Sequence, residues 1–291
     1  RVWSYFNMFT ARGNEFLPYI LGDTDTPMPL FVKPDRKISV QDVKNAMRDH
    51  YEGTPLDISK DFGAGPYHTP YRLSPLSFKV GDKEYFNERP ISTQQSGFVF
   101  VAQMRSTLPD AIGGVLWFGT DDANMTVFTP VYCCTDKVPV CYSRVDGADY
   151  ITFSWNSSFW IFNWVSNMVY PRYDLMIGDV RATQNELETT FNEAQEGIES
   201  AAKLLEKDPA KAKAFLTNYT NMTAQSAFDT WKRLGEFIIV KYNDGVVRKM
   251  KDGKFERNAI GQPAGVVRPG YPKEFLEEYV KQTGDRYKMP D

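Results

Sequence analysis

The sequence has few of the residues on which metal sites and catalytic triads depend. Its 291 residues include only two histidines, His50 and His68, and three cysteines. It contains no HExxH or paired-cysteine motif for zinc, and no GxSxG turn for a serine nucleophile. We therefore expect neither a metal nor another cofactor, and we interpret His50 as a helix-capping or surface residue.

An excess of charge of one sign and long apolar runs are also missing. The 34 basic and 37 acidic side chains give a net charge of −3, which suits neither a polyanion nor an anionic membrane surface. The most apolar run, residues 159–165, is far shorter than the roughly 18 residues that a membrane-spanning helix needs. Nucleic acid and membrane are therefore not expected as partners.

The three cysteines, Cys133, Cys134 and Cys141, are too few for a disulfide scaffold. Adjacent Cys133 and Cys134 would form only a strained bridge, so the alternatives are one bridge to Cys141 or free, buried thiols. The chain begins with Arg1 instead of Met. We therefore expect that upstream sequence has been removed, and we favour a secreted or periplasmic protein whose signal peptide is absent from this chain.

Residues 1–90 are predicted to be rich in loops and to hold one helix. Proline and glycine interrupt every periodic pattern in residues 1–37 and again in residues 51–90. Between these stretches Ser39 is a candidate N-cap, and apolar residues follow it at helical spacing from Val40 to Asp49. Long loops in a compact protein are usually functional or held against another part of the molecule.

A change of pattern in residues 91–135 predicts the core β-strands. Continuous apolar runs cover Phe98–Ala102, Val115–Phe118 and Thr126–Tyr132, and the short connections between them favour antiparallel pairing. The first two runs do not alternate with polar residues, so we expect both faces of the sheet to be covered. Two stacked sheets with helices outside are the simplest such architecture.

The C-terminal half is predicted to be helical, with a helical layer in residues 155–243 and a tail in residues 244–291. The longest predicted helix carries an apolar stripe with glutamate and lysine on the opposite side. The tail also holds a hairpin-like turn at Lys251–Lys254. The expected helices are, in order, Ser157–Met168, one of about 30 residues that Asp208–Pro209 ends, a further one that begins at Pro209, then Ala224–Tyr242 and Lys273–Thr283.

Arg105 is the residue that most suggests a functional site. It stands near the end of a core strand, where a guanidinium is costly unless it is paired or hydrogen-bonded. Its fork of donors suits the carboxylate of a substrate, and in that case we expect the donors to stay free of other partners. The structural alternative is a salt bridge to one of three nearby acids, Asp110, Asp121 or Asp122.

Other polar residues flank the same strands. Gln94 and Gln95 precede the first strand, and Asp121 and Asp122 lie in the turn after the second. The candidate substrate-binding residues are Arg105, Gln94, Gln95 and Asp121. A glycosidase would need two carboxylates that face one another across a substrate, which adjacent residues in a turn seldom do. The alternative is that the two Asp side chains form the turn by bonding to their own backbone.

Several segments, taken in order along the chain, resemble a known family. They are Met47–Pro55, Ser92–Phe98 with Val101–Ser106, Gly113–Gly119 with Asp121–Ala123, Phe153–Trp155, Arg172–Tyr173 and Thr283–Asp285. Each segment by itself is a weak signal, but their order over nearly the whole chain is specific. The sequence resembles family sixty-nine of the cysteine peptidases, a set of bacterial dipeptidases.

The resemblance implies an α+β fold of the N-terminal nucleophile hydrolase type, with two stacked antiparallel sheets between helical layers (αββα). It also implies hydrolysis of short peptides by a cysteine that becomes the first residue when upstream sequence is removed. This chain begins with Arg1, and members of the family are considerably longer. We therefore interpret residues 1–291 as the C-terminal part of a single hydrolase domain, incomplete and inactive alone, with its nucleophile on absent sequence.

The partners that follow from the resemblance are a small peptide substrate and the remaining N-terminal part of the same enzyme, while homo-oligomer formation is left open. An alternative from another class is a non-catalytic domain whose aromatic loops, Tyr51 to Tyr85, hold a peptide or a glycan. A Cys-Thr pair directly after a cleavable leader in the precursor would favour the enzyme.

Overall fold

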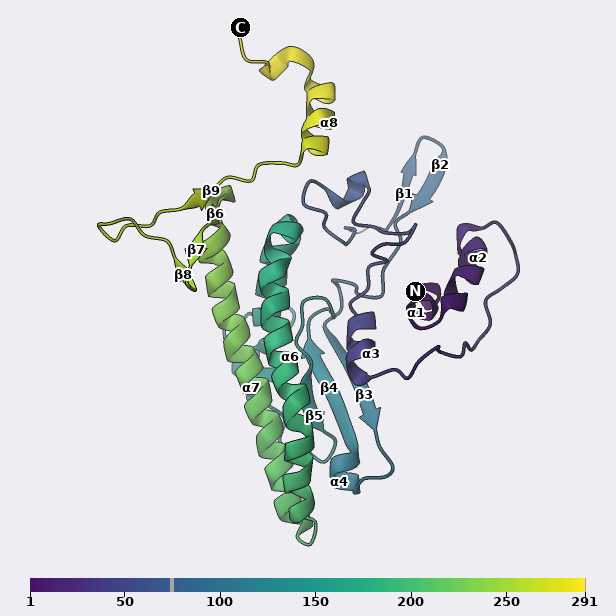
Figure 1. The fold of residues 1–291 in the computed structure, drawn as a ribbon, viewed down its shortest axis with the longest axis vertical. Coiled ribbons are helices and arrows are strands. Elements are labelled where there is room, and N and C mark those ends of the chain that lie inside the picture. Colours follow the sequence, from purple (N-terminus) through teal and green to yellow (C-terminus); the bar gives the residue numbers. More distant parts are fainter. Residues whose placement is uncertain (74–75, 291) are drawn as a thin grey trace.

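Long helices dominate the α+β fold of this chain (Figure 1). A computed structural model describes residues 1–73 and 76–290. The α-helices of these residues are α1 (Val2–Phe9), α2 (Leu17–Leu21), α3 (Val40–Ala46), α4 (Asp110–Gly113), α5 (Ser158–Val169), α6 (Tyr173–Leu204), α7 (Pro209–Tyr242) and α8 (Lys273–Thr283). Helices α6 and α7 lie side by side as a long hairpin.

The strands of the described residues form one three-stranded antiparallel sheet and three two-stranded ribbons. The order in the larger sheet is β3-β4-β5, so β3 and β5 are its edges. The strands are β1 (Ser77–Val80), β2 (Lys83–Phe86), β3 (Phe98–Met104), β4 (Gly114–Thr120), β5 (Thr129–Tyr132), β6 (Val247–Arg248), β7 (Met250–Lys251), β8 (Lys254–Phe255) and β9 (Val266–Val267).

The helices cover one face of the three-stranded sheet. Val101 of β3 and Trp117 of β4 lie opposite each other, so their side chains point to the same face. Both are buried in one core cluster together with Ile161 of α5, Phe191 of α6 and Trp231 of α7. The apolar stripes of these helices therefore pack against every second residue of the strands.

The opposite face of the sheet is exposed. Phe98, Phe100 and Met104 alternate with the buried valines of β3, and 59%, 50% and 70% of their surface is exposed. Leu116 and Phe118 of β4 complete this surface, which we call the open face, and they are half-buried. The expectation that both sides of these strands are covered is therefore wrong for this chain, since its described residues contain no second sheet stacked on the first.

The C-terminal half is helical as predicted, but the helix expected from Pro209 and the one expected at Ala224–Tyr242 form a single helix. Helix α6 has 32 residues, and α7 runs without interruption from Pro209 to Tyr242, so the helix expected from Ala224 is its second half. Asp208 caps α7 by accepting the N–H of Lys211, and Pro209 occupies the first turn, where no N–H is needed.

The packing of α5 against α7 requires a glycine. Gly235 lies where Trp164 of α5 reaches α7, and a Cβ at this position would collide with the indole ring. One turn away, Phe162 of α5 stacks on Trp231 of α7 with 4.8 Å between the ring centroids. A larger residue at position 235 would push the two helices apart and disturb this stack.

The first 90 residues contain more regular structure than the sequence predicts. Helix α1 buries Trp3 and Phe9, and the indole N–H of Trp3 donates to the carbonyl of Gly13 at 3.0 Å. The prediction of irregular structure was wrong here because α1 precedes the first proline, and Pro18 lies in the first turn of α2, where it is tolerated. Ser39 caps α3 as predicted, in a capping box with Asp42.

The tail extends beyond the end of α7 (Figure 1). Its last helix, α8, has the predicted bounds Lys273–Thr283, and the predicted hairpin at Lys251–Lys254 is the turn between β7 and β8. Among the described residues, none of the helices combines the length and the apolar composition needed to cross a bilayer.

Two matched substitutions test how the sheet is covered. Phe128, just before β5, is fully buried, so Phe128→Ala should lower the free energy of unfolding by about 3–5 kcal/mol. Phe100→Ala removes the same side chain from the open face and should cost less than about 1.5 kcal/mol in this chain. Urea unfolding followed by circular dichroism measures both changes. Equal losses would mean that the open face is covered in solution.

Candidate functional site

Three of the four predicted site residues lie at one end of the three-stranded sheet. Gln94 and Gln95 belong to the turn before β3, and Asp121 follows β4. The backbone N–H of Asp121 donates to the carbonyl of Gly97 at 3.0 Å and joins these two segments. Arg105 follows the far end of β3, whose seven residues span roughly 23 Å. The structure therefore does not bring Arg105 to the other three residues.

Asp122 forms the turn after β4. Its Oδ1 accepts the N–H groups of Asn124 and Met125 at 2.8 and 3.0 Å, and its Oδ2 accepts the hydroxyl of Tyr170 at 2.7 Å. Both Asp121 and Asp122 are buried. Asp122 therefore forms the turn by bonding to its own backbone, which is the alternative given above. The two carboxyl groups are not a pair that faces across an open cleft, as a glycosidase needs.

Asp121 is a buried acid with one unpartnered oxygen. Its φ of 73° lies in the left-handed region, which Asp tolerates better than most residues. Its Oδ2 has no hydrogen-bond partner within the described residues. Burial first, and then the charge of Asp122, raises the pKa of Asp121 well above its ordinary value. This shift is toward the neutral carboxyl, which can donate one hydrogen bond.

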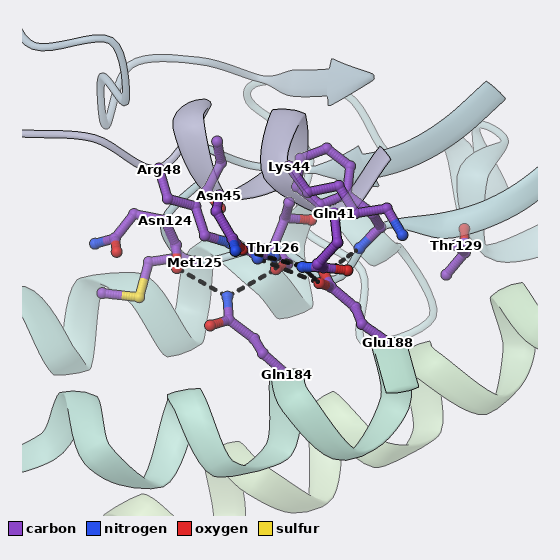
Figure 2. Close-up of polar contacts among 12 residues, drawn as sticks. Gln41, Lys44, Asn45, Arg48, Asn124, Met125, Thr126, Thr129, Gln184 and Glu188 are labelled. Carbon is purple, nitrogen blue, oxygen red and sulfur yellow. Dashed lines mark hydrogen bonds and ion pairs between the residues drawn. The ribbon is translucent and has the colours of Figure 1, made fainter. Parts of the chain in front are cut away.

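A buried ion pair connects the end of α3, the β4–β5 connection and α6 (Figure 2). Arg48 Nη2 lies 2.5 Å from Glu188 Oε1, and these side chains are 10% and 3% exposed. Arg48 also donates to the carbonyls of Ala123 and Thr126, while Glu188 accepts the N–H of Phe128. Burial alone would raise the pKa of Glu188, but the charge and hydrogen bonds of Arg48 outweigh it and lower that pKa.

Helix α6 supplies two more side chains to the same connection. Gln184 donates to the carbonyls of Asn124 and Thr126 at 2.8 and 2.7 Å, as Figure 2 shows, and Arg181 donates to that of Asn124 at 2.7 Å. These bonds satisfy backbone carbonyls that burial has removed from water. The four side chains that hold the β4–β5 connection, which we call the polar cradle, are Arg48, Arg181, Gln184 and Glu188.

Lys44 is a second buried cation beside the polar cradle. From α3, its Nζ donates to Asn192 Oδ1 at 3.0 Å and lies 3.4 Å from the centroid of the Trp117 ring. Burial lowers the pKa of Lys44 from 10.5 to about 7, although Glu188 opposes the shift. The cation–π contact and the amide partner compensate only part of the lost hydration.

His50 is buried and is not a surface or capping residue, so that interpretation is wrong. Its Nδ1 lies 2.9 Å from Glu52 Oε1, and its backbone N–H donates to Glu52 Oε2 at 2.7 Å. The turn is possible because Tyr51, between them, has a positive φ of 67° and brings Glu52 back over the imidazole. Across residues 1–73 and 76–290, no group of three or more His, Cys, Asp and Glu side chains could hold a metal ion.

Arg105 is paired with a carboxylate, so the expectation that its donors stay free is wrong. Its Nη2 and Nη1 lie 2.6 and 2.8 Å from the two oxygens of Glu199, and Nη2 also donates to the carbonyl of Ile112. This pair ties the end of β3 to α6. A role of Arg105 in substrate binding stays a prediction. The partner is not one of the acids suggested by the sequence, Asp110, Asp121 and Asp122.

Sequence reasoning missed the polar cradle and Lys44. One signal was present: positions 181, 184 and 188 are three and four residues apart, so they share one face of a helix. On an otherwise amphipathic helix, polar residues adjoining the apolar stripe of Leu187 and Phe191 indicate a buried polar contact. The partner Arg48 lies 140 residues away in sequence, and no local pattern identifies it.

The pKa of Lys44 predicts a pH dependence of stability. Between about pH 7 and 10 the unfolded chain holds the lysine proton and the folded chain does not, so raising the pH favours folding. This group therefore contributes a rise of up to about 1.4 kcal/mol per pH unit to the free energy of unfolding.

The variant Lys44→Met should remove that contribution, while Lys203→Met, at an exposed position of α6, should keep it. Urea unfolding at pH 7, 8 and 9 measures the difference between each variant and the parent chain. A difference between Lys44→Met and the parent that does not change with pH would show that the folded protein keeps Lys44 protonated.

The comparisons with known proteins point to one group of enzymes. The chain is 26% identical to the probable dipeptidase B of Lactococcus lactis subsp. lactis (strain IL1403) over 252 residues, which are 81% of this chain and 45% of that protein. It is 32% identical to a probable dipeptidase of Salmonella dublin over 132 residues, 45% of this chain and 25% of that one. It is 26% identical to dipeptidase A of Lactobacillus helveticus over 137 residues, 47% of this chain and 24% of that protein.

The chain thus spans less than half the length of these relatives. A family model, that of peptidase family C69, matches residues 1–186. The matched part includes α3, the three-stranded sheet and the β4–β5 connection that the polar cradle holds. Since the match covers well over half of the 291 residues, the chain belongs to peptidase family C69.

Proposed function

We propose that this chain is the C-terminal portion of a dipeptidase that hydrolyses short peptides by attack of a cysteine, and that this cysteine lies upstream of Arg1. The relatives are named dipeptidases, and the most extensive of the three alignments reported above covers 45% of the relative. The remaining part of the enzyme would then supply the nucleophile and its surroundings.

The open face of the sheet carries this proposal. Phe98, Phe100 and Met104 place three large apolar side chains in water on one strand, which is unfavourable for a finished core. A second sheet stacked about 10 Å away would bury them. We infer that the upstream part of the enzyme provides this sheet and completes the stacked fold of an N-terminal nucleophile hydrolase.

The thiols of this chain do not suit the role of the nucleophile. Burial raises the pKa of Cys141 to about 12 and also raises that of Cys134, so neither forms the reactive thiolate readily at neutral pH. Cys133 is exposed. The Nδ1 atoms of His50 and His68 are engaged by Glu52 and by the carbonyl of Ser59, and no thiol is bonded to them in the part of the chain described.

We assign the substrate-facing end of this chain to the turn before β3 and the β4–β5 connection. Gln95 is exposed there, and its amide group can bond to a peptide. Gln94 is half-buried, and its amide N–H donates to the carbonyl of Arg72 at 3.2 Å, which leaves its Oε1 as an acceptor. Asp121 lies on the neighbouring segment, whose backbone the polar cradle holds in place. Arg48 and Glu188 then act as positioning residues, because they reach the substrate only through that backbone.

The aromatic loops of residues 51–85 give less support to a peptide- or glycan-binding domain. Tyr51 is buried and donates its hydroxyl to the carbonyl of Arg89 at 2.6 Å. Tyr71 packs edge-on against Tyr170 with 4.8 Å between the centroids. Tyr51 and Tyr71 therefore contribute to internal packing, whereas the exposed rings of these loops are Phe62, Phe78 and Tyr85, of which Phe78 and Tyr85 stack on each other.

The activity of two proteins tests the proposal. The full-length protein should hydrolyse dipeptides, and treatment with iodoacetamide should abolish the activity, whereas the 291-residue chain should show none because it lacks an activated thiolate. Release of amino acids from a panel of dipeptides measures both. Cys133→Ser in the full-length protein serves as the control and should leave the activity intact. Thiol-dependent hydrolysis by the 291-residue chain would contradict the proposal.

Arg105→Lys separates a structural role from a role in substrate binding. Lysine keeps the charge but cannot bond to both oxygens of Glu199 in a fork. In the full-length protein we expect a lower melting temperature, by about 1–2 °C for each kcal/mol lost, and little change in kcat/KM per folded molecule. Arg144→Lys, at a pair with Asp149 that is largely exposed, is the control. An unchanged melting temperature with kcat/KM reduced at least about tenfold would assign Arg105 to the substrate.

A further inference from the structure

A cavity separate from the sheet lies between the tail helix α8 and the loop that precedes β1. Its volume is about 520 Å³, which is within the range of small-molecule sites. Lys60, Phe62 and His68 line it from the loop, and Glu274 and Phe275 line it from α8. Figure 1 shows α8 next to this loop, beyond the end of the α6–α7 hairpin. The family match ends at residue 186, so α8 lies outside it.

Tyrosine contacts hold α8 against the loop at one end of this cavity. The hydroxyl of Tyr67 donates to the carbonyl of Gly270 at 3.1 Å, and its ring lies 6.1 Å from that of Tyr271. Tyr271 in turn contacts Phe275, with 4.9 Å between the centroids. The tail is therefore attached just before α8 begins, and the cavity opens between the first turns of the helix and the loop.

The two walls of the cavity carry unpaired charges of opposite sign. On the loop, Asp61 is neutralised because Arg72 Nη2 lies 2.5 and 2.6 Å from its two oxygens. On α8, Glu278 pairs with Lys281 at 3.1 Å. Lys60 and Glu274 are exposed and form no ion pair within the described residues, although the charge of Lys60 helps to lower the pKa of Asp57. One cation therefore remains on the loop wall, and one anion remains on the helix wall.

The same cavity offers apolar surface and a hydrogen-bond acceptor. Phe62 is 77% exposed and, with the half-buried Phe275, contributes one aromatic ring from each wall. The Nδ1 of His68 lies 2.9 Å from the carbonyl oxygen of Ser59. Because a carbonyl oxygen can only accept a hydrogen bond, Nδ1 is the ring nitrogen that carries the proton. In the neutral ring Nε2 is then an acceptor. A ligand that covers these groups would gain both apolar burial and polar partners.

We propose that this cavity binds a free apolar α-amino acid in its zwitterionic form. Lys60 would hold the carboxylate, Glu274 the ammonium group, and the two phenylalanines the side chain. The source of the ligand rests on the proposed function, because hydrolysis of a dipeptide releases free amino acids. A product bound here would join the tail to the body of the molecule, at a site distinct from the end of the sheet assigned to the substrate.

Calorimetric titration of the full-length protein and of the 291-residue chain with L-leucine tests the proposal. We expect saturable binding to both, with a Kd on the order of 1 mM for so small a ligand in an open site. Lys60→Glu and Glu274→Lys should each weaken binding about tenfold or more, because each places a like charge against one end of the zwitterion. Glu277→Lys changes the same charge on α8 outside the cavity and should leave the Kd unchanged.

Ligand analogues test the two charged ends separately. N-acetyl-L-leucine lacks the ammonium group and L-leucinamide lacks the carboxylate, so both should bind at least about tenfold more weakly than L-leucine. Glycyl-L-leucine, measured on alkylated protein, should also bind more weakly.

Four outcomes would overturn the proposal. They are no leucine binding up to about 20 mM, equal binding of the analogues, no effect of either charge reversal, and tighter binding of the dipeptide than of leucine. Leucine binding in a protein that hydrolyses no dipeptide would overturn the proposed function and leave this site standing.

Discussion

The ion pair between Arg48 and Glu188 is the interaction on which the arrangement of the matched region depends. It joins the end of α3 to α6 and, through the carbonyls of Ala123 and Thr126 and the N–H of Phe128, fixes the β4–β5 connection between them. A buried pair is weak evidence for stability in itself, but loss of one partner leaves the other charge unpaired in the interior, at a cost of about 3–5 kcal/mol. The connection that follows β4 can therefore keep one conformation although it contains little regular structure.

This rigidity has a consequence for the candidate site. The segment that begins at Asp121 runs directly into the backbone that the polar cradle holds, so the position of this buried acid is set by side chains from two other elements. The open face of the sheet, in contrast, is not held by contacts of this kind in the described part of the chain. Phe98 stacks on Phe118 of the same face, but Phe98, Phe100 and Met104 each stay at least half exposed, which is unfavourable unless another surface covers them. The sheet thus has one face that α5, α6 and α7 cover and one face that is exposed.

Much of the local structure could be predicted from the sequence. Ser39 and Asp42 form the capping box of α3, Pro209 begins α7, and the bounds of α8 agree with the apolar pattern, because each of these signals acts within one or two helical turns. The candidate site was predictable in part. Gln94, Gln95 and Asp121 meet at one end of the sheet, whereas Arg105 does not join them, because an antiparallel strand carries its last residue to the opposite end.

The sequence by itself determined the starts of α3, α7 and α8 and the apolar pattern of β3 and β4, and it favoured a turn formed by Asp122. Only the tertiary structure decided that Glu199 is the partner of Arg105, that Lys44 lies buried against Trp117, and that one face of the apolar strands stays exposed. The physical reason is the range of the interactions. Caps, turns and periodicity depend on neighbours in the chain, whereas the partner of a buried charge and the cover of a sheet depend on elements that packing brings together from distant positions.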